Sequence, residues 1–139
     1  MDAILLCLTL FAVHDGDDAL RGCALAPHVA EASESHGHDP RVVMAIGWVE
    51  TRWKPWLIGS SGERGALQVL PRFSGLRPAE LSQASVGVWA GAGALARWRK
   101  RASGNLRRSV QAYNAGNAGL KGLAGIEYAD QVLALSRRY

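Results

Sequence analysis

Apolar residues recur along the chain at helical spacing, and no segment alternates between apolar and polar residues as a half-buried strand would. Glycine and proline interrupt the apolar segments and mark the loops between them. The pattern therefore predicts an all-α fold. The expected helices cover residues 26–35, 40–53, 65–70, 77–81, 85–102, 106–113 and 126–138, with a loop over most of 114–125.

The helix over residues 40–53 has the clearest boundaries. Asp39 can cap free backbone N–H groups, and Pro40 suits the first helical position because its missing N–H would have no partner there. Pro55 disfavours a helical conformation at Lys54 and so ends the helix.

Glu50 is the acidic residue of this helix that points toward its apolar face. At about 100° per residue, Glu50 falls between Ile46 and Val43 on the helical wheel. Burial disfavours a charged carboxylate and raises its pKa, which suits a general acid that works near neutral pH. A buried structural Glu, held by an Arg or a backbone amide, is the alternative.

Length and composition predict one domain with an affinity for anionic polymers. The chain has 139 residues, of which 48% are apolar, so it can bury one core. The net charge of +4 and the pI near 9.5 favour bacterial cell wall, nucleic acid or a membrane surface without choosing among them.

The apolar run at residues 3–13 has the length of a signal-peptide core and is too short for an ordinary membrane span. No Lys or Arg precedes it, and an acidic stretch follows. We therefore expect residues 1–22 to be either a signal peptide or an extra N-terminal helix, and residues 23–139 to form the catalytic domain. Cys7 and Cys23 could pair only if the run is retained in an oxidising compartment, and we expect two small buried hydrophobes instead.

Two polar clusters have simpler explanations than a ligand site. His36 and His38 could bind a metal, but Asp39 beside them serves as a helix cap and no distant ligand set is evident, so we predict no metal site. Residues 98–101 read Trp-Arg-Lys-Arg at a helix end, where cations suit the helix dipole. Contact with an anionic wall polymer is the functional alternative for this run.

Four sequence blocks, in order, resemble the soluble lytic transglycosylase family, which is similar in fold to goose-type lysozyme. Residues 50–55 read Glu-Thr-Arg-Trp-Lys-Pro against the family's Glu-Ser-x-x-x-Pro. Residues 62–71 follow Gly-x-x-Gly-Leu-Met-Gln-x-x-Pro at the same spacing, with Ala66-Leu67 in place of Leu-Met. Residues 112–116 are the unchanged block Ala-Tyr-Asn-Ala-Gly. Residues 128–132 approximate Tyr-Val-x-x-Val.

The resemblance implies a lysozyme-like single domain of several helices around a glycan-binding cleft. It implies that Glu50 is the catalytic acid and base, that Gln68 and Asn114 bind the sugar, and that Tyr113 and Tyr128 line the site, Tyr128 near the carboxyl of Glu50. The family's loop serine falls on Gly59 in this chain, and Ser60 beside it is the remaining candidate for a sugar-contacting hydroxyl.

The resemblance also implies a mechanism with a single carboxyl group and no metal or cofactor. An ordinary glycosidase needs two carboxylates, and the nearest second acid, Glu63, occupies a variable motif position that we expect to face solvent. In the family's reaction the muramic C6 hydroxyl attacks C1 and leaves a 1,6-anhydro ring. A muramidase that uses water, with Glu63 or Asp130 as the second acid, and a non-catalytic wall-binding module are the alternatives.

The expected partner is therefore the glycan strand of peptidoglycan, with no nucleic acid and no stable membrane span. We expect export to the periplasm or cell envelope, with a virion-associated phage protein as the alternative. The chain could also serve an envelope-spanning secretion or phage assembly.

Overall fold

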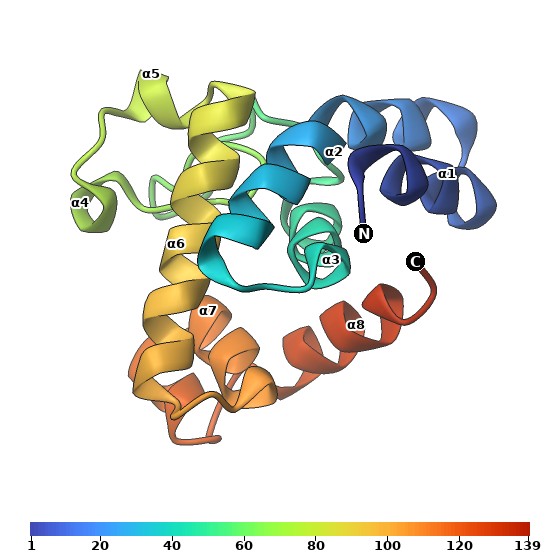
Figure 1. The fold of residues 1–139 in the computed structure, drawn as a ribbon. Helices are drawn as coiled ribbons and strands as arrows, with labels where there is room; N and C mark the ends of the chain where they lie inside the picture. The colour runs from blue at the N-terminus through green and yellow to red at the C-terminus, as the bar shows by residue number, and fades with distance from the viewer.

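The computed structural model describes residues 1–139 and contains eight helices and no sheet, which confirms the all-α prediction (Figure 1). Two isolated β-bridges join Arg64 to Ile58 and to Val69 in the loop before the fourth helix. The helices are α1 (Ala3–Val13), α2 (Gly16–His36), α3 (Pro40–Thr51), α4 (Pro71–Ser74), α5 (Pro78–Leu81), α6 (Ala84–Arg101), α7 (Leu106–Leu120) and α8 (Ile126–Ser136).

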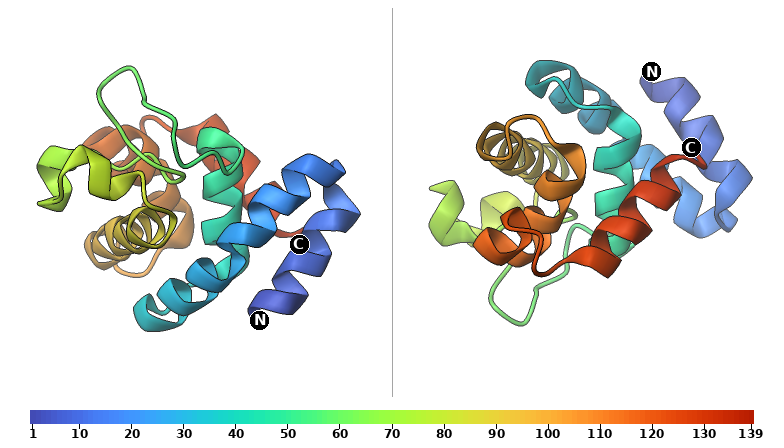
Figure 2. Two further views of the ribbon diagram at one scale, coloured as in Figure 1. Left: turned by 90° about the horizontal axis from the view of Figure 1, so that it is seen from above. Right: turned by 90° about the horizontal axis from the view of Figure 1, so that it is seen from below.

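Helix α3 is the central helix of the core and begins as the sequence predicts. The Asp39 side chain accepts a hydrogen bond from the Arg41 N–H at 2.9 Å, and Pro40 opens the helix. Every residue from Val42 to Gly47 is buried, and α3 packs against both α2 and α8 (Figure 2).

The end of α3 redirects the chain and positions the loop that follows. Arg52 and Trp53 have φ angles of 52° and 60°, so the helix stops two residues earlier than expected. The Trp53 indole is 1% exposed and donates a hydrogen bond to the Met44 carbonyl at 2.9 Å. Its ring therefore lies back along α3, and the burial of a large aromatic side chain stabilises this uncommon backbone.

The expected start of the helix at residue 26 was wrong, because α2 begins ten residues earlier, at Gly16. Pro27 lies inside the helix on its exposed side. It removes one backbone hydrogen bond. The buried stripe that includes Ala19, Ala26 and Val29 spans the proline and keeps the helix continuous.

Two further expectations about the loops were wrong. Residues 65–70 are not a helix, because Gly65 and Gln68 have positive φ angles and the backbone of Arg64 bonds that of Val69 twice, at 2.9 and 3.0 Å. Helix α7 continues beyond Tyr113 to Leu120, with one non-helical residue at Gly116.

The glycines of α6 allow close packing against a loop and a short helix. A Cβ on Gly87 would collide with the Leu81 carbonyl at the end of α5, and a Cβ on Gly91 would collide with the Leu67 side chain. The loop that follows α3 is thereby held against α6.

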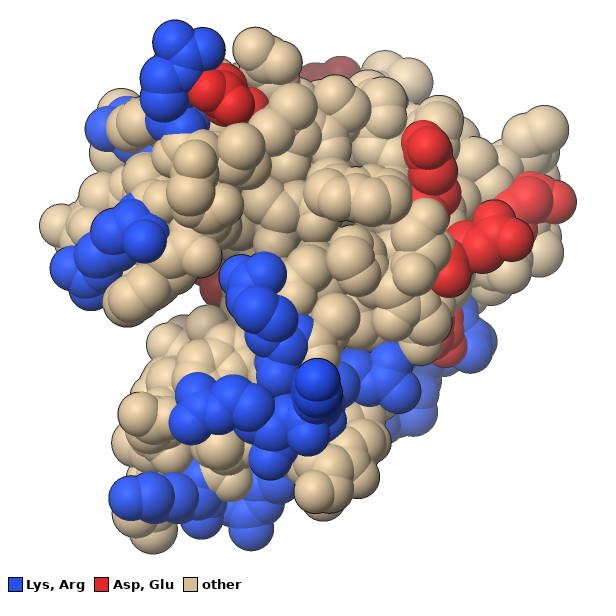
Figure 3. Space-filling model, turned by 60° about the vertical axis from the view of Figure 1, so that its left-hand side comes forward, with Lys and Arg blue, Asp and Glu red and all other residues tan.

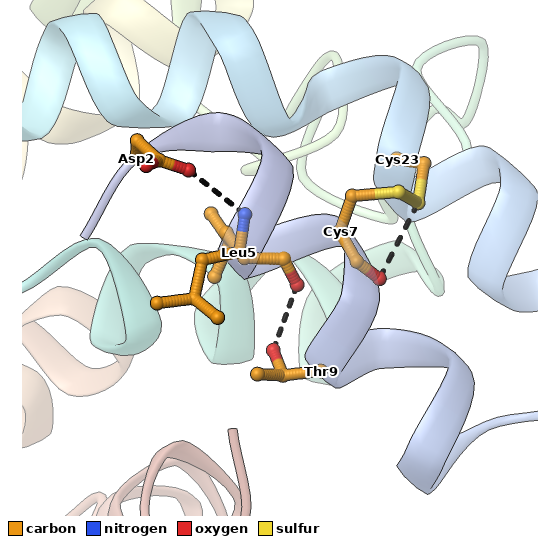
Figure 4. Close-up of a disulfide and its surroundings, with 6 residues drawn as sticks. Asp2, Leu5, Cys7, Thr9 and Cys23 are labelled. Carbon is orange, nitrogen blue, oxygen red and sulfur yellow. Dashed lines mark hydrogen bonds between the residues drawn. A yellow bond between two sulfur atoms is a disulfide. The ribbon is translucent and has the colours of Figure 1, made fainter.

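Helix α1 contributes to the core through Leu6 and Leu10, both 0% exposed. A disulfide joins Cys7 on α1 to Cys23 on α2, so the expectation of two unpaired cysteines was wrong (Figure 4). The two helices lie side by side and bring the Cα atoms within 4.7 Å, inside the range that a disulfide spans.

The C-terminus lies close to α1 in both views of Figure 2, and a hydrogen bond of 2.8 Å between His14 and the Tyr139 hydroxyl joins the two ends of the chain. None of the helices is both long and apolar enough to span a membrane.

Candidate active site

A cleft of about 790 Å³ runs between the loop after α3 and the helices α6 and α7. Figure 3 shows it as a hollow in the surface, with basic side chains gathered along its lower rim. The cleft brings together five of the six residues that the sequence proposed for the site, namely Glu50, Ser60, Gln68, Tyr113 and Asn114. Tyr128 is not among the lining residues.

Glu50 lies on the last turn of α3 and is half-buried. Burial raises the pKa of its carboxyl group to about 7, and the negative charge of Glu63 adds to this rise. A hydrogen bond from the Tyr128 hydroxyl to Oε1, 2.7 Å long, acts in the opposite direction on the pKa. Near neutral pH the group is therefore divided between its acid and base forms, as a catalyst that both gives and takes a proton requires.

The two tyrosines predicted at the site hold it from different sides. Tyr128 reaches Glu50 from α8. Tyr113 lines the cleft from α7, and its hydroxyl donates a hydrogen bond of 2.5 Å to the Leu67 carbonyl. Burial raises the pKa of both phenols well above the ordinary value, so both remain hydrogen-bond donors at neutral pH.

Gln68 is held in place by its own amide group. The Nε2 atom donates to the carbonyls of Leu57 and Gly65 at 3.1 and 3.0 Å, and the backbone of Gln68 has a φ angle of 52°. The amide nitrogen thus stabilises the loop, and the amide oxygen is the atom that remains for a sugar N–H or O–H group.

Asn114 and Ser60 lie exposed on opposite walls of the cleft, on α7 and on the loop after α3. Neither side chain has a hydrogen-bond partner within the protein, so both can contact a ligand. Two residues after Asn114, the backbone of Gly116 adopts φ 61° and ψ −139° and turns the chain away from a regular helix.

Glu63 lies in the cleft, contrary to the expectation that it faces solvent. Its side chain is half-buried, and Oε2 accepts a hydrogen bond from the Ser61 N–H at 3.1 Å. A Cβ on Gly59 would collide with this carboxylate and crowd the Gln68 amide oxygen. Glu63 and Gln68 therefore occupy the space that a side chain at residue 59 would fill. The glycine that stands in place of the family's serine could have indicated this position of Glu63.

The sequence motifs also missed the wall formed by α6. Arg97, Trp98 and Arg101 line the cleft from the last turns of this helix, and Asn117 lies next to them on α7. No motif includes Arg97 or Asn117. The cation run at residues 98–101 did point to this region.

No three His, Cys, Asp or Glu side chains lie together in a way that could hold a metal ion. His38 is buried, its Nε2 lies 2.8 Å from the Ala92 carbonyl, and its Nδ1 lies 3.0 Å from an Arg99 nitrogen. These contacts join the segment before α3 to α6, so His38 has a structural role.

The all-helical domain with a half-buried carboxyl group in its cleft is the arrangement that the resemblance to lysozyme-like enzymes implied. A family model described as the transglycosylase SLT domain matches residues 27–129, and the chain therefore belongs to this family. Its fold is similar to that of the X-ray structure of an inactive mutant of the lytic transglycosylase Slt from Pseudomonas aeruginosa. The TM-score is 0.67 at 17% sequence identity, over 78% of this chain and 22% of that chain. No curated protein matches the sequence.

Proposed function

We propose that this protein is a peptidoglycan lytic transglycosylase in which Glu50 is the single catalytic acid and base. One observation carries the proposal: in a chain of the SLT family, the residue that matches the motif glutamate lies in the cleft with a pKa raised to about 7. The substrate is the β-1,4 bond between N-acetylmuramic acid and N-acetylglucosamine.

The reaction begins when protonated Glu50 gives its proton to the glycosidic oxygen. The C1–O bond breaks, and the acetamido group of the muramic residue stabilises the positive charge that develops at C1. The carboxylate of Glu50 then removes the proton of the C6 hydroxyl, whose oxygen attacks C1 and closes the 1,6-anhydro ring. This attack is intramolecular and so gains the advantage of proximity.

The surrounding residues position Glu50 and the sugar. Tyr128 holds one carboxyl oxygen of Glu50, so the other is left to face the glycosidic bond. Asn114 and the Gln68 amide oxygen offer hydrogen bonds to the sugar, and Ser60 offers a hydroxyl from the opposite wall. Tyr113 keeps the loop and α7 together, which maintains the width of the cleft.

A muramidase is the second candidate function, and the position of Glu63 favours it. Glu63 lines the same cleft as Glu50 and is close enough for its charge to affect the pKa of that group. A carboxylate in this place could activate a water molecule for attack at C1. Asp130, the other candidate, is exposed and paired with Arg107 at 2.6 Å, outside the cleft.

The substitution Glu50→Gln tests the role of the acid. We expect it to reduce the release of soluble fragments from purified peptidoglycan by about 100-fold or more, with binding to the wall retained. Glu127→Gln, on the exposed surface of α8, is the matched control and should keep full activity. More than about a tenth of wild-type turnover in Glu50→Gln would contradict the single-acid mechanism. A wild-type protein that binds the wall but releases nothing would be a binding module.

We also propose that the protein acts in an oxidising compartment, in the periplasm or cell envelope. The Cys7–Cys23 disulfide supports this location because such bonds persist outside the reducing cytoplasm. Thiol labelling of protein taken directly from cells should modify neither cysteine. Labelling of both would contradict the proposal, and recovery of the protein from purified virions would favour the phage alternative.

A further inference from the structure

The wall of the cleft formed by α6 carries two arginines on one face of the helix. Arg97 and Arg101 are four residues apart, so both point in the same direction, and both are exposed and line the cleft. Trp98 lies between them. Figure 3 shows the basic side chains on this side of the hollow.

Neither arginine is neutralised by an acidic side chain. The four ion pairs of the protein join Arg21 to Asp18, Arg41 to Asp39, Arg77 to Glu80 and Arg107 to Asp130, and none of these pairs lies in the cleft. The charges of Arg97 and Arg101 are therefore available to a ligand.

The Arg101 guanidinium is held in place by neutral groups. It donates a hydrogen bond of 2.8 Å to the side-chain oxygen of Asn117, and its Cζ lies 4.7 Å from the centre of the Trp98 ring. Arg97 lines the same wall and is near enough to Tyr113 for its positive charge to oppose the rise of the phenol pKa caused by burial. The two cations thus lie on the same wall of the cleft that Glu50 lines.

The helix dipole explains the presence of cations at this end of α6 but not their direction. Arg99 and Lys100 belong to the same last turn and lie outside the cleft, and Arg99 donates to the Gly37 carbonyl at 2.7 Å. They satisfy the dipole without facing a ligand. The orientation of Arg97 and Arg101 into the cleft therefore needs a second reason.

The sugar rings of the glycan are neutral, and the acidic groups of the strand lie on the lactyl arm of each muramic residue. We propose that Arg97 and Arg101 form a subsite for a carboxylate on this arm, which makes the cleft selective for acidic glycans over neutral ones. The inference rests on the proposed function. The carboxylate comes either from the lactyl group of a strand without peptides or from the peptide stem, and guanidinium groups bind both through charge-assisted hydrogen bonds.

Binding measurements in the Glu50→Gln background test the subsite without cleavage. Three soluble ligands of equal length serve as probes: a neutral N-acetylglucosamine oligomer, a glycan with free lactyl carboxylates, and the same glycan with peptide stems. We expect Arg97→Gln together with Arg101→Gln to raise the Kd for an acidic ligand by about tenfold, and to change the Kd for the neutral oligomer less than about twofold. Lys100→Gln removes the same charge from the same turn outside the cleft and should change neither value.

The peptide stem is joined to the lactyl carboxyl through an amide, so each acidic ligand carries only one of the two carboxylate sources. A loss with the free-lactyl ligand alone assigns the subsite to the lactyl carboxylate, a loss with the stem-bearing ligand alone assigns it to the peptide, and a loss with both shows that the subsite accepts either carboxylate. An equal loss with the neutral oligomer, or no loss with either acidic ligand, would overturn the proposal. Cleavage of peptidoglycan by the wild-type protein separates the two hypotheses. If the wild type cleaves but the arginine variant binds normally, the subsite alone is wrong; if the wild type neither cleaves nor binds, both are wrong.

Discussion

Glu50 occupies a position in which burial acts against its charge. The carboxyl group is half-buried, and the single hydrogen bond that it accepts, from Tyr128, does not compensate for the lost hydration, because its pKa remains raised to about 7. The same burial that raises the pKa of the acid for catalysis therefore reduces the stability of the folded protein at every pH at which the group is ionised.

The pH dependence of stability should show this cost. The pKa of Glu50 is higher in the folded state than in the unfolded state, so the cost is absent at low pH, grows as the pH rises from about 4.5 to about 7, and stays constant above. Glu50→Gln removes this cost. The substitution should therefore raise the free energy of unfolding more at pH 8 than at pH 4, by up to about 3 kcal/mol. Urea unfolding at the two pH values measures the difference, and an effect independent of pH would contradict the raised pKa.

The two neighbours of Glu50 should shift the pH dependence of activity in opposite directions. Loss of the acid form predicts that kcat/KM falls above a pH of about 7 in the wild type. Tyr128→Phe removes a hydrogen bond that stabilises the carboxylate and should move this limb to higher pH. Glu63→Gln removes a repelling charge and should move it to lower pH. Shifts of the two variants in the same direction would show that these contacts do not control the pKa of Glu50.

At the scale of the helices, local signals predicted α3 well and α2 and α7 less well. The Asp39 cap and Pro40 determine the start of α3 through contacts within a few residues, which a sequence shows directly. The length of α2 depends on burial of a stripe against α3 and α6, and this packing outweighs the effect of Pro27. Asn114 and Gly116 resemble the start of a loop, although tertiary contacts extend the helix beyond them.

Helix α1 gives a test of whether the N-terminal segment belongs to the folded domain. Leu10 is 0% exposed, packs at Gly22 of α2 and belongs to the same hydrophobic core as Trp53, whereas Leu8 on the same helix is 62% exposed. Leu10→Ala should lower the free energy of unfolding by about 2–5 kcal/mol, as for other buried leucines. Leu8→Ala is the control and should cost less than about 1 kcal/mol. Equal effects of the two substitutions would show that α1 does not pack on the core in solution.

At the scale of the whole molecule, the cleft is made by segments far apart in the sequence. Motif spacing identified Glu50, Gln68, Tyr113 and Asn114, which the structure brings together. It did not place Glu63 or Arg97 in the cleft. Their directions depend on how the loop after α3 packs on α6, through contacts such as that of Gly91 with Leu67, and a single sequence does not show such contacts. The disulfide was missed for the same reason, since it depends on the pairing of α1 with α2.

The central claim is that Glu50 works alone and that the muramic C6 hydroxyl, not water, attacks C1. Digestion of purified peptidoglycan in water labelled with heavy oxygen, followed by mass spectrometry of the fragments, tests it directly. The account predicts 1,6-anhydro ends, one water lighter than hydrolysed ends, without incorporated label. Reducing ends that carry the heavy oxygen would contradict it and would assign the protein as a muramidase, with Glu63 as the first residue to test for the activation of water.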